Sequence, residues 1–220
     1  MIYSDLYGQA YSEASVSSLP VSDLVAGNIL QVLSESNGFY KVLFPDKRIA
    51  FIPVQKAQPF DQWERRPNPD ATQILTTARR FLGIPYLWGG TSVKGMDCSG
   101  FTKTSYFLNG IILPRDASQQ ALVGEPVDIF EGDTVSIAKS LKSLKAGDLL
   151  FFAGNRKTMR VSHTAIYIGN GEFIQAAGLV RINSMIKESH NYDDFQSRAL
   201  VGARRMLTAV GNPEITRVNQ

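Results

Sequence analysis

The sequence contains few of the residues from which disulfide frameworks and metal sites are built. Among 220 residues there is one cysteine, Cys98, and there are two histidines, His163 and His190. A single cysteine excludes an internal disulfide, and two histidines so placed do not have the spacing of a zinc site. We therefore expect no metal and no organic cofactor. The lone thiol is either a buried structural residue or a nucleophile.

Long apolar runs are also missing. No stretch approaches the ~20 consecutive apolar residues that a transmembrane helix needs, so we expect no membrane span. The first fifteen residues, MIYSDLYGQAYSEAS, lack a basic region followed by an apolar one, and no signal peptide is evident. We expect a periplasmic or cell-envelope location if a leader was removed, and a cytoplasmic one otherwise.

Charge of one sign is not concentrated anywhere in the chain. The formal net charge is +3, and the 23 basic residues are scattered. This distribution does not favour a nucleic-acid partner. With 44% hydrophobic and 20% charged residues the composition is that of a globular protein, long enough for one large domain or two small ones.

The first part of the chain, residues 1–60, has the pattern of short β-strands. Segments 28–34, 39–44 and 49–53 are rich in β-forming apolar residues and are separated by turn sequences. We predict a small β-barrel here. Residues 61–70, DQWERRPNPD, are polar with two prolines and predict a linker.

The remainder, residues 71–208, combines helical and β patterns, and residues 209–220 have the appearance of a loose tail. Helices are predicted first and strands later, which indicates an α+β domain. The expected helices cover residues 71–82 and 98–108, and the expected strands cover residues 148–152, 164–168 and 172–177.

Cys98 lies where a glycine-rich segment enters the second predicted helix. The unpaired N–H groups and the dipole of a helix start favour a thiolate and can also bind an oxyanion. A cysteine nucleophile needs a base. His163 begins a predicted strand, where a side chain is held rigidly beside a cleft, whereas His190 lies in a polar loop. We therefore prefer His163.

A third group must orient the base, and Gln175 is the candidate in the returning strand. If Gly169, Asn170 and Gly171 form a three-residue loop, Gln175 shares a face with His163 on a diagonal. A two-residue loop of Asn170 and Gly171 would place Gln175 on the opposite face. The hairpin pattern alone leaves both registers open.

Five segments taken in order resemble the NlpC/P60 family of cell-wall cysteine peptidases. They are Gly83-Ile-Pro-Tyr-Leu-Trp-Gly-Gly90, Asp97-Cys-Ser-Gly-Phe101, Leu113-Pro-Arg115 with Gln119-Gln120, Ala146-Gly-Asp-Leu-Leu-Phe-Phe152, and Ser162-His-Thr-Ala-Ile-Tyr-Ile-Gly-Asn-Gly-Glu-Phe-Ile-Gln-Ala177. The resemblance implies a papain-like α+β core in which Cys98 is the nucleophile, His163 the base and Gln175 the orienting residue. The family often has a histidine at the third position. A glutamine carbonyl accepts the ring N–H but carries no charge.

The N-terminal sixty residues resemble a bacterial SH3 domain, more loosely. Such a barrel joined to this catalytic domain resembles the γ-D-glutamyl-L-diamino acid endopeptidases, which cleave muropeptides with a free N-terminal L-alanine and whose barrel closes one end of the cleft. The resemblance implies peptidoglycan stem peptides or muropeptides as partners. It also implies substrate binding by Tyr86, Asp97 and Ser99, although Tyr86 could equally be a packed side chain and Asp97 a helix cap.

Three positions depart from the family pattern. Arg115 is followed by Asp116 and Ala117, which leaves Ser118, the expected substrate-binding serine, one place late. In the barrel, Arg48 lies in the run where an aromatic would help to hold the amine, and it would repel an ammonium if it pointed inward. Asp23 is a possible acidic contact.

These departures leave three hypotheses. The first is a peptidase that cleaves the γ-D-Glu–diamino acid bond through a thioester acyl-enzyme. The second is a catalytically impaired wall-binding module. The third is a related amidase or acyltransferase that uses the same Cys-His pair, because a fold does not determine a substrate.

Overall fold

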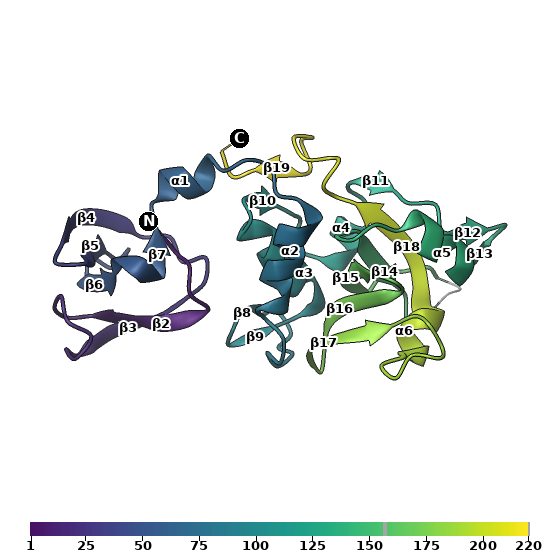
Figure 1. Cartoon of the computed structure of the whole chain (residues 1–220), viewed down its shortest axis with the longest axis horizontal. Helices are drawn as coiled ribbons and strands as arrows, with labels where there is room; N and C mark the ends of the chain where they lie inside the picture. The colour runs from purple at the N-terminus through teal and green to yellow at the C-terminus, as the bar shows by residue number, and fades with distance from the viewer. Residues whose placement is uncertain (156–157, 220) are drawn as a thin grey trace. The chain divides into compact units, whose positions relative to one another are not determined.

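The computed structural model describes residues 1–155 and 158–219 of the chain. Up to Val218 this chain divides into two compact units, Met1–Pro67 and Asn68–Val218, which can be followed by colour in Figure 1. The division falls inside the segment that we expected to be a linker. That segment is not irregular throughout, because Phe60–Glu64 forms helix α1, in which Trp63 is buried.

The first unit is built on a sheet of five antiparallel strands in the order β3-β2-β6-β5-β4. Two further short strands, β1 and β7, pair separately. The strands are β1 (Ile2–Tyr3), β2 (Tyr7–Tyr11), β3 (Pro20–Val25), β4 (Gln31–Ser36), β5 (Phe39–Leu43), β6 (Ile49–Pro53) and β7 (Ala57–Gln58), and a 3₁₀ turn, η1, covers Val54–Lys56.

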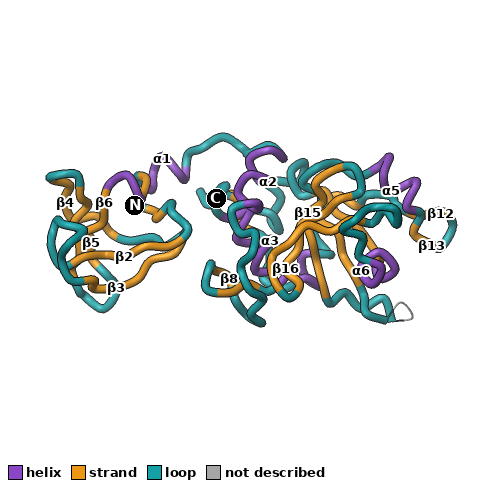
Figure 2. Tube along the Cα trace, turned by 60° about the horizontal axis from the view of Figure 1, so that its bottom comes forward, coloured by secondary structure: helices purple, strands orange, loops and turns teal. Residues whose placement is uncertain are grey.

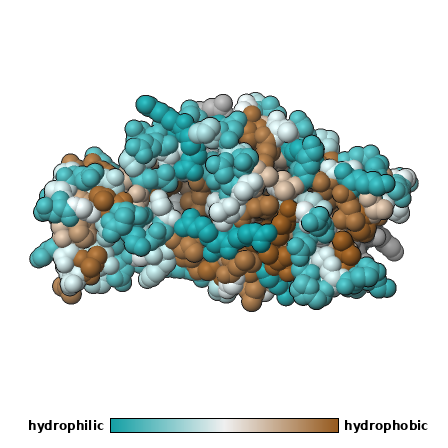
Figure 3. All heavy atoms as spheres, in the orientation of Figure 1, coloured by the Kyte–Doolittle hydropathy of each residue, from teal (hydrophilic) through white to brown (hydrophobic). Residues whose placement is uncertain are grey.

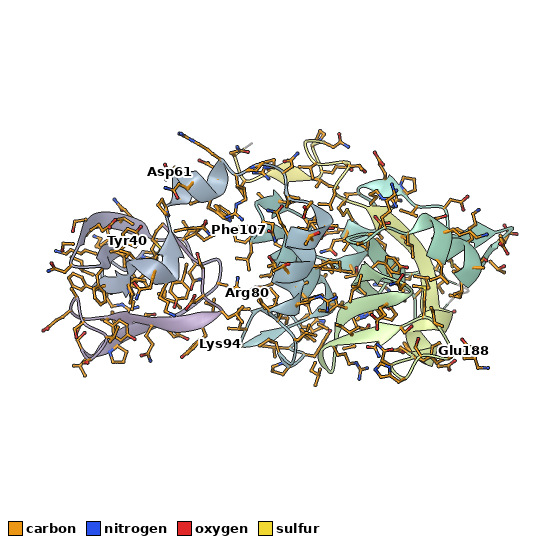
Figure 4. The ribbon with its side chains drawn as sticks, viewed as in Figure 1. Tyr40, Asp61, Arg80, Lys94, Phe107 and Glu188 are labelled. Atoms are coloured by element: carbon orange, nitrogen blue, oxygen red, sulfur yellow. The ribbon has the colours of Figure 1, made fainter. Side chains whose placement is uncertain are left out.

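Alternation along the strands produces the core of this unit. Tyr40 and Val42 of β5, with Ala50 and Ile52 of β6, turn inward; Tyr40 is labelled in Figure 4. Every residue of β4 is exposed, because β4 is an edge of the sheet. No pairing joins the two edges, β3 and β4, within the described residues. The sheet is therefore open, and the closed barrel that we expected is not found.

The second unit contains a six-stranded sheet in the order β11-β18-β14-β15-β16-β17, in which every pair is antiparallel. The three predicted strands are β14, β15 and β16, and the sequence pattern missed the other three, β11, β17 and β18. The strands are β11 (Glu125–Pro126), β14 (Leu149–Phe152), β15 (His163–Gly169), β16 (Glu172–Ala177), β17 (Leu179–Ser184) and β18 (Leu200–Arg205).

Helices α2 and α3 lie side by side, and α3 packs on the sheet (Figures 1 and 2). Helix α2 (Ala71–Arg79) begins at a capping box formed by Asp70 and Gln73 and ends three residues before the predicted limit. Its last turn tightens, because the N–H groups of residues 80–82 bond three residues back rather than four. Helix α3 (Cys98–Phe107) closely matches its predicted span.

The two faces of the sheet are covered differently. Helix α3 packs on β15 and β16. The other face carries an apolar cluster that includes Leu150, Phe152, Tyr167 and Phe173. The remaining helices are α4 (Ala117–Gln120), α5 (Ile137–Ser143) and α6 (Asp194–Ala199). Helix α3 on one face and the apolar cluster on the other bury both faces of the central strands, which gives β15 and β16 a rigid environment.

The C-terminal segment is not the loose tail that we expected. Strand β19 (Thr216–Arg217) pairs with β10 (Ile111–Ile112), and Ile215 is fully buried. Two short hairpins lie elsewhere in this unit, and they pair β8 (Thr91–Ser92) with β9 (Gly95–Met96) and β12 (Phe130–Glu131) with β13 (Thr134–Val135). Within the described residues, no helix has the length and apolar character needed to cross a bilayer.

Candidate active site

Cys98 is the first residue of α3, and the chain holds this helix start in two ways. The carboxylate of Asp97 caps the helix by accepting the N–H of Gly100 at 2.6 Å. The loop before the helix approaches very closely, because a Cβ on Gly100 would lie 2.1 Å from the carbonyl oxygen of Gly90. The glycines of this region therefore allow the loop to press against the helix start.

The thiol itself is buried, with 6% of the residue exposed. Burial raises the pKa of Cys98, and the N–H groups of Thr164, Ser99 and Cys98 itself offset this only in part, while the Asp97 carboxylate raises it further. We expected the helix start to lower this pKa. The outcome differs because desolvation outweighs the backbone N–H groups, so the thiol is protonated at neutral pH in the free protein.

Beside the thiol lies a charged cluster centred on Asp97. Arg115 binds both carboxylate oxygens of Asp97, at 2.6 and 3.1 Å, and also reaches the hydroxyl of Ser99 at 3.0 Å. The second oxygen of Asp97 also accepts the N–H of Gly89 at 2.9 Å. Burial raises the pKa of Asp97, but the bonds from Arg115, Gly100 and Gly89 outweigh it and hold the pKa below its usual range. Asp97 is therefore ionised and extensively bonded.

His163 and Gln175 are in direct contact, with 2.6 Å between the imidazole Nε2 and the amide Oε1. Strands β15 and β16 pair Ile166 with Ile174, which is the register expected for the three-residue loop. The tip itself pairs Gly169 with Glu172 around a two-residue turn, and a bulge between Tyr167 and Gly169 restores the longer register. The register of the three-residue loop thus holds in the strands, and the two-residue turn forms the tip.

The orientation of the Gln175 amide determines the tautomer of His163. The Gln175 amino group donates to Asn183 Oδ1 at 2.9 Å and to Asp193 Oδ2 at 3.1 Å. Asn183 is itself oriented, because its amino group donates to the carbonyl of Asn191 at 3.3 Å. The Gln175 oxygen must then face His163, so Nε2 donates a proton to it. Nδ1 is left unprotonated and can accept a proton.

Burial governs the acidity of this imidazole. Desolvation lowers the pKa of His163, and the bond to Gln175 and the charge of Asp193 raise it in part. The raised pKa of the thiol and the lowered pKa of the imidazole both favour the neutral forms of these two groups. The ring also lies against Phe152, with 5.6 Å between the ring centroids, which holds its plane.

A pocket lies beside Cys98, and neither His163 nor Gln175 is among the residues that line it. His163 is flanked by Ser162, which lines the pocket, and by Thr164, whose N–H reaches the Cys98 thiol. The full lining is Tyr86, Trp88, Gly89, Asp97, Cys98, Ser99, Arg115, Asp116, Ala117, Ser118, Val161 and Ser162. Trp88 is 86% exposed. Figure 3 shows other hydrophobic residues at the surface among hydrophilic ones.

The predicted binding residues separate into two groups. Tyr86, Asp97, Ser99 and Ser118 all line the pocket that contains Cys98. Asp23 and Arg48 belong to the first unit, and their role in binding stays a prediction.

Within that first unit, Arg48 makes local contacts. It donates to Asp46 and to the carbonyl of Val21, both at 2.7 Å, and lies over the ring of Phe44. In the second unit, His190 is exposed, in keeping with a solvated loop residue.

Sequence reasoning missed Arg115, Asn183 and Asp193 as members of the site. Arg115 had a signal, because it ends the Leu-Pro-Arg segment quoted above. Asn183 and Asp193 had none, because their meeting with Gln175 depends on pairing of β16 with β17 and on the return of a long loop. Within the described residues there is no group of His, Cys, Asp and Glu side chains suited to a metal ion.

Comparison with known proteins places these features in context. Residues 83–205 match the NlpC/P60 family. The chain is 37% identical over 147 residues to the γ-D-glutamyl-L-lysine dipeptidyl-peptidase of Bacillus cereus, covering 67% of this chain and 40% of that protein. It is 35% identical over 150 residues to the Bacillus subtilis protein of the same name, covering 67% and 44%. The chain thus spans less than half the length of these two relatives.

A solved structure resembles most of the chain. It is an NlpC/P60 family protein from Bacillus cereus, with a TM-score of 0.75 and 32% sequence identity, and the match covers 94% of this chain and 62% of that one. This coverage extends beyond residues 83–205 into the first unit.

Proposed function

Since the chain belongs to the NlpC/P60 family, we propose that it is a cysteine peptidase in which Cys98 is the nucleophile, His163 the base and Gln175 the residue that orients the base. One observation carries this proposal. The Gln175 carbonyl accepts from Nε2 of His163, which leaves Nδ1 to take the thiol proton. This is the arrangement that a Cys-His pair needs.

The reaction then follows from the neutral resting pair. His163 Nδ1 accepts the thiol proton as the sulfur attacks the substrate carbonyl, and the backbone N–H groups at the start of α3 stabilise the oxyanion. The imidazolium gives its proton to the leaving amine, and a thioester remains on Cys98. Water attacks the thioester with His163 as base, which releases a carboxylate product and restores the thiol.

We propose peptidoglycan stem peptides as substrates, cleaved between γ-linked D-glutamate and the diamino acid. The names of the two Bacillus relatives support this bond type. The charges of the pocket also suit it, because Asp97 can attract an N-terminal ammonium and Arg115 can attract the free carboxylate of a γ-linked glutamate. Tyr86, Ser99 and Ser118 supply hydroxyl groups at the same pocket.

We also propose that the first unit is an SH3-like domain. Its five short antiparallel strands support this assignment, as does the length of the match to the solved Bacillus cereus structure.

The test uses L-Ala-γ-D-Glu-diaminopimelate with a free and with an acetylated N-terminus. We expect cleavage of the free peptide and little cleavage of the acetylated one, and no cleavage by Cys98→Ala. Equal cleavage of both would exclude a requirement for the free amine.

Labelling of Cys98 with iodoacetamide at neutral pH separates the alternatives. We expect His163→Ala to slow it. If labelling is slow and indifferent to His163, the chain is an impaired binding module rather than a peptidase. If labelling depends on His163 but neither peptide is cleaved, the pair acts on another amide, as an amidase or acyltransferase would.

A further inference from the structure

We propose that Asp193 is a positioning residue that acts through the amide of Gln175 and supplies the negative charge that stabilises the imidazolium of His163. The inference rests on the proposed function, because it concerns the same base. It addresses a specific problem of this chain, whose third residue is a neutral amide that cannot itself balance a positive ring.

The contact is held by backbone rather than by side chains alone. The loop that carries Glu188 (Figure 4) leaves β17 and returns to it. Ser184 of β17 donates its N–H to the carbonyl of Asn191 at 2.9 Å, and the N–H of Asp193 donates to the Ser184 carbonyl at 3.0 Å. These two bonds fix the half-buried Asp193 where its Oδ2 accepts from the Gln175 amino group at 3.1 Å.

The amide lies between the carboxylate and the ring with its dipole aligned to both. Its positive amino end faces Asp193, and its negative oxygen end faces His163. In a buried site, a carboxylate polarises such a chain of hydrogen bonds and strengthens the acceptor at the far end. A protonated ring is therefore stabilised more than a neutral one.

Other charged or titratable side chains of the described residues lie on the elements around this base. Helix α3 carries Cys98, whose thiolate forms when His163 takes its proton. From β17 comes Arg181, which is exposed and pairs directly across the sheet from Gln175. From α6 comes Asp194, which accepts from the hydroxyl of Tyr192 at 3.3 Å. Among them, Asp193 is the charge in contact with the amide that touches His163.

The charge of Asp193 can be removed without disturbing the orientation of the Gln175 amide. Asn183 accepts the other bond of the Gln175 amino group and is oriented by the Asn191 carbonyl. This second acceptor stays in place when Asp193 becomes asparagine, whose own oxygen can still accept. Asp193→Asn therefore removes the charge and leaves the amide with its oxygen toward His163.

The experiment measures alkylation of Cys98 by iodoacetamide, an uncharged probe, from acid to alkaline pH in the full chain. The neutral-pH rate depends on the fraction of thiolate–imidazolium pair, and we expect Asp193→Asn to lower it about fivefold. At high pH the thiolate forms without help from His163, so the limiting rate stays that of wild type. Asp193→Glu should restore most of the neutral-pH rate.

Asp194→Asn is the matched control, because it removes the same charge one residue later without a contact to Gln175, and we expect a wild-type profile. An equal loss at all pH values in Asp193→Asn would mean a structural role and would overturn the proposal. So would an unchanged profile in a protein whose labelling still requires His163. If Cys98 is labelled as fast in the His163→Ala variant as in wild type, the proposed function itself fails.

Discussion

The thiol side and the imidazole side of the site each contain an aspartate, and they use it in different ways. On the thiol side, Asp97 is buried and accepts from Arg115, Gly89 and Gly100. On the imidazole side, Asp193 is separated from His163 by the Gln175 amide. The first carboxylate is bonded on both oxygens, whereas the second transmits its effect through a neutral group.

Asp97 acts on the structure around the nucleophile, whereas Asp193 acts on the protonation of His163. A carboxylate that caps a helix and pairs with an arginine holds the nucleophile in place. A carboxylate behind an amide changes how readily the ring takes a proton. The thiol side should therefore respond to mutation mainly in stability, and the imidazole side mainly in rate.

The largest expected effect is on the thiol side. Asp97→Ala removes the cap of α3 and takes the carboxylate partner from Arg115, so we expect the free energy of unfolding to fall by about 3 kcal/mol. Urea unfolding followed by circular dichroism measures the change.

Asp70→Ala provides the matched control for that measurement, because Asp70 caps α2 by accepting the N–H of Gln73 at 2.8 Å and is exposed. We expect it to lose about 1 kcal/mol. Equal losses in the two variants would show that the Arg115 pair adds nothing to the cap. Asp97 would then stabilise the fold only as an ordinary helix cap.

The next effect is on the imidazole side. Gln175→Leu keeps similar bulk but removes the acceptor of the Nε2 proton, so the ring loses its tautomer and orientation. We expect kcat on the peptide substrate to fall about thirtyfold, with KM nearly unchanged, because Gln175 does not line the pocket beside Cys98.

Gln175→Asn is the comparison variant, since it keeps the amide on a shorter side chain, and we expect an intermediate rate. A rise in KM with unchanged kcat in Gln175→Leu would instead assign Gln175 to substrate binding.

The smallest effect is the contribution of Asp97 to stability in acid. The folded pKa of Asp97 is held below its unfolded value, so this carboxylate stabilises the fold above the unfolded pKa. That stabilisation is lost as pH falls through the folded pKa. Asp97→Asn should therefore lose less stability on acidification than wild type, by about 1 kcal/mol.

Urea unfolding of both proteins at neutral pH and near pH 3 gives this difference. Parallel pH profiles would mean that carboxylates other than Asp97 account for the acid sensitivity.

Much of the second unit could be predicted because its signals are local. The cap at Asp70, the helix start at Cys98 and the strand 172–177 each depend on residues near in sequence, and the structure has them. The tail was mispredicted for the opposite reason. Strand β19 exists because it pairs with β10, about a hundred residues earlier in the chain.

The sequence by itself determined the candidate residues, which are one thiol at a helix start and one histidine at a strand start, with a family pattern around both. Tertiary structure alone decided the acidities and the partners. Whether the thiol is charged depends on how deeply the fold buries it, because desolvation exceeds the local effect of the helix start. That Gln175 connects His163 to Asp193 depends on a bulge and a returning loop, which bring together residues that no local pattern relates.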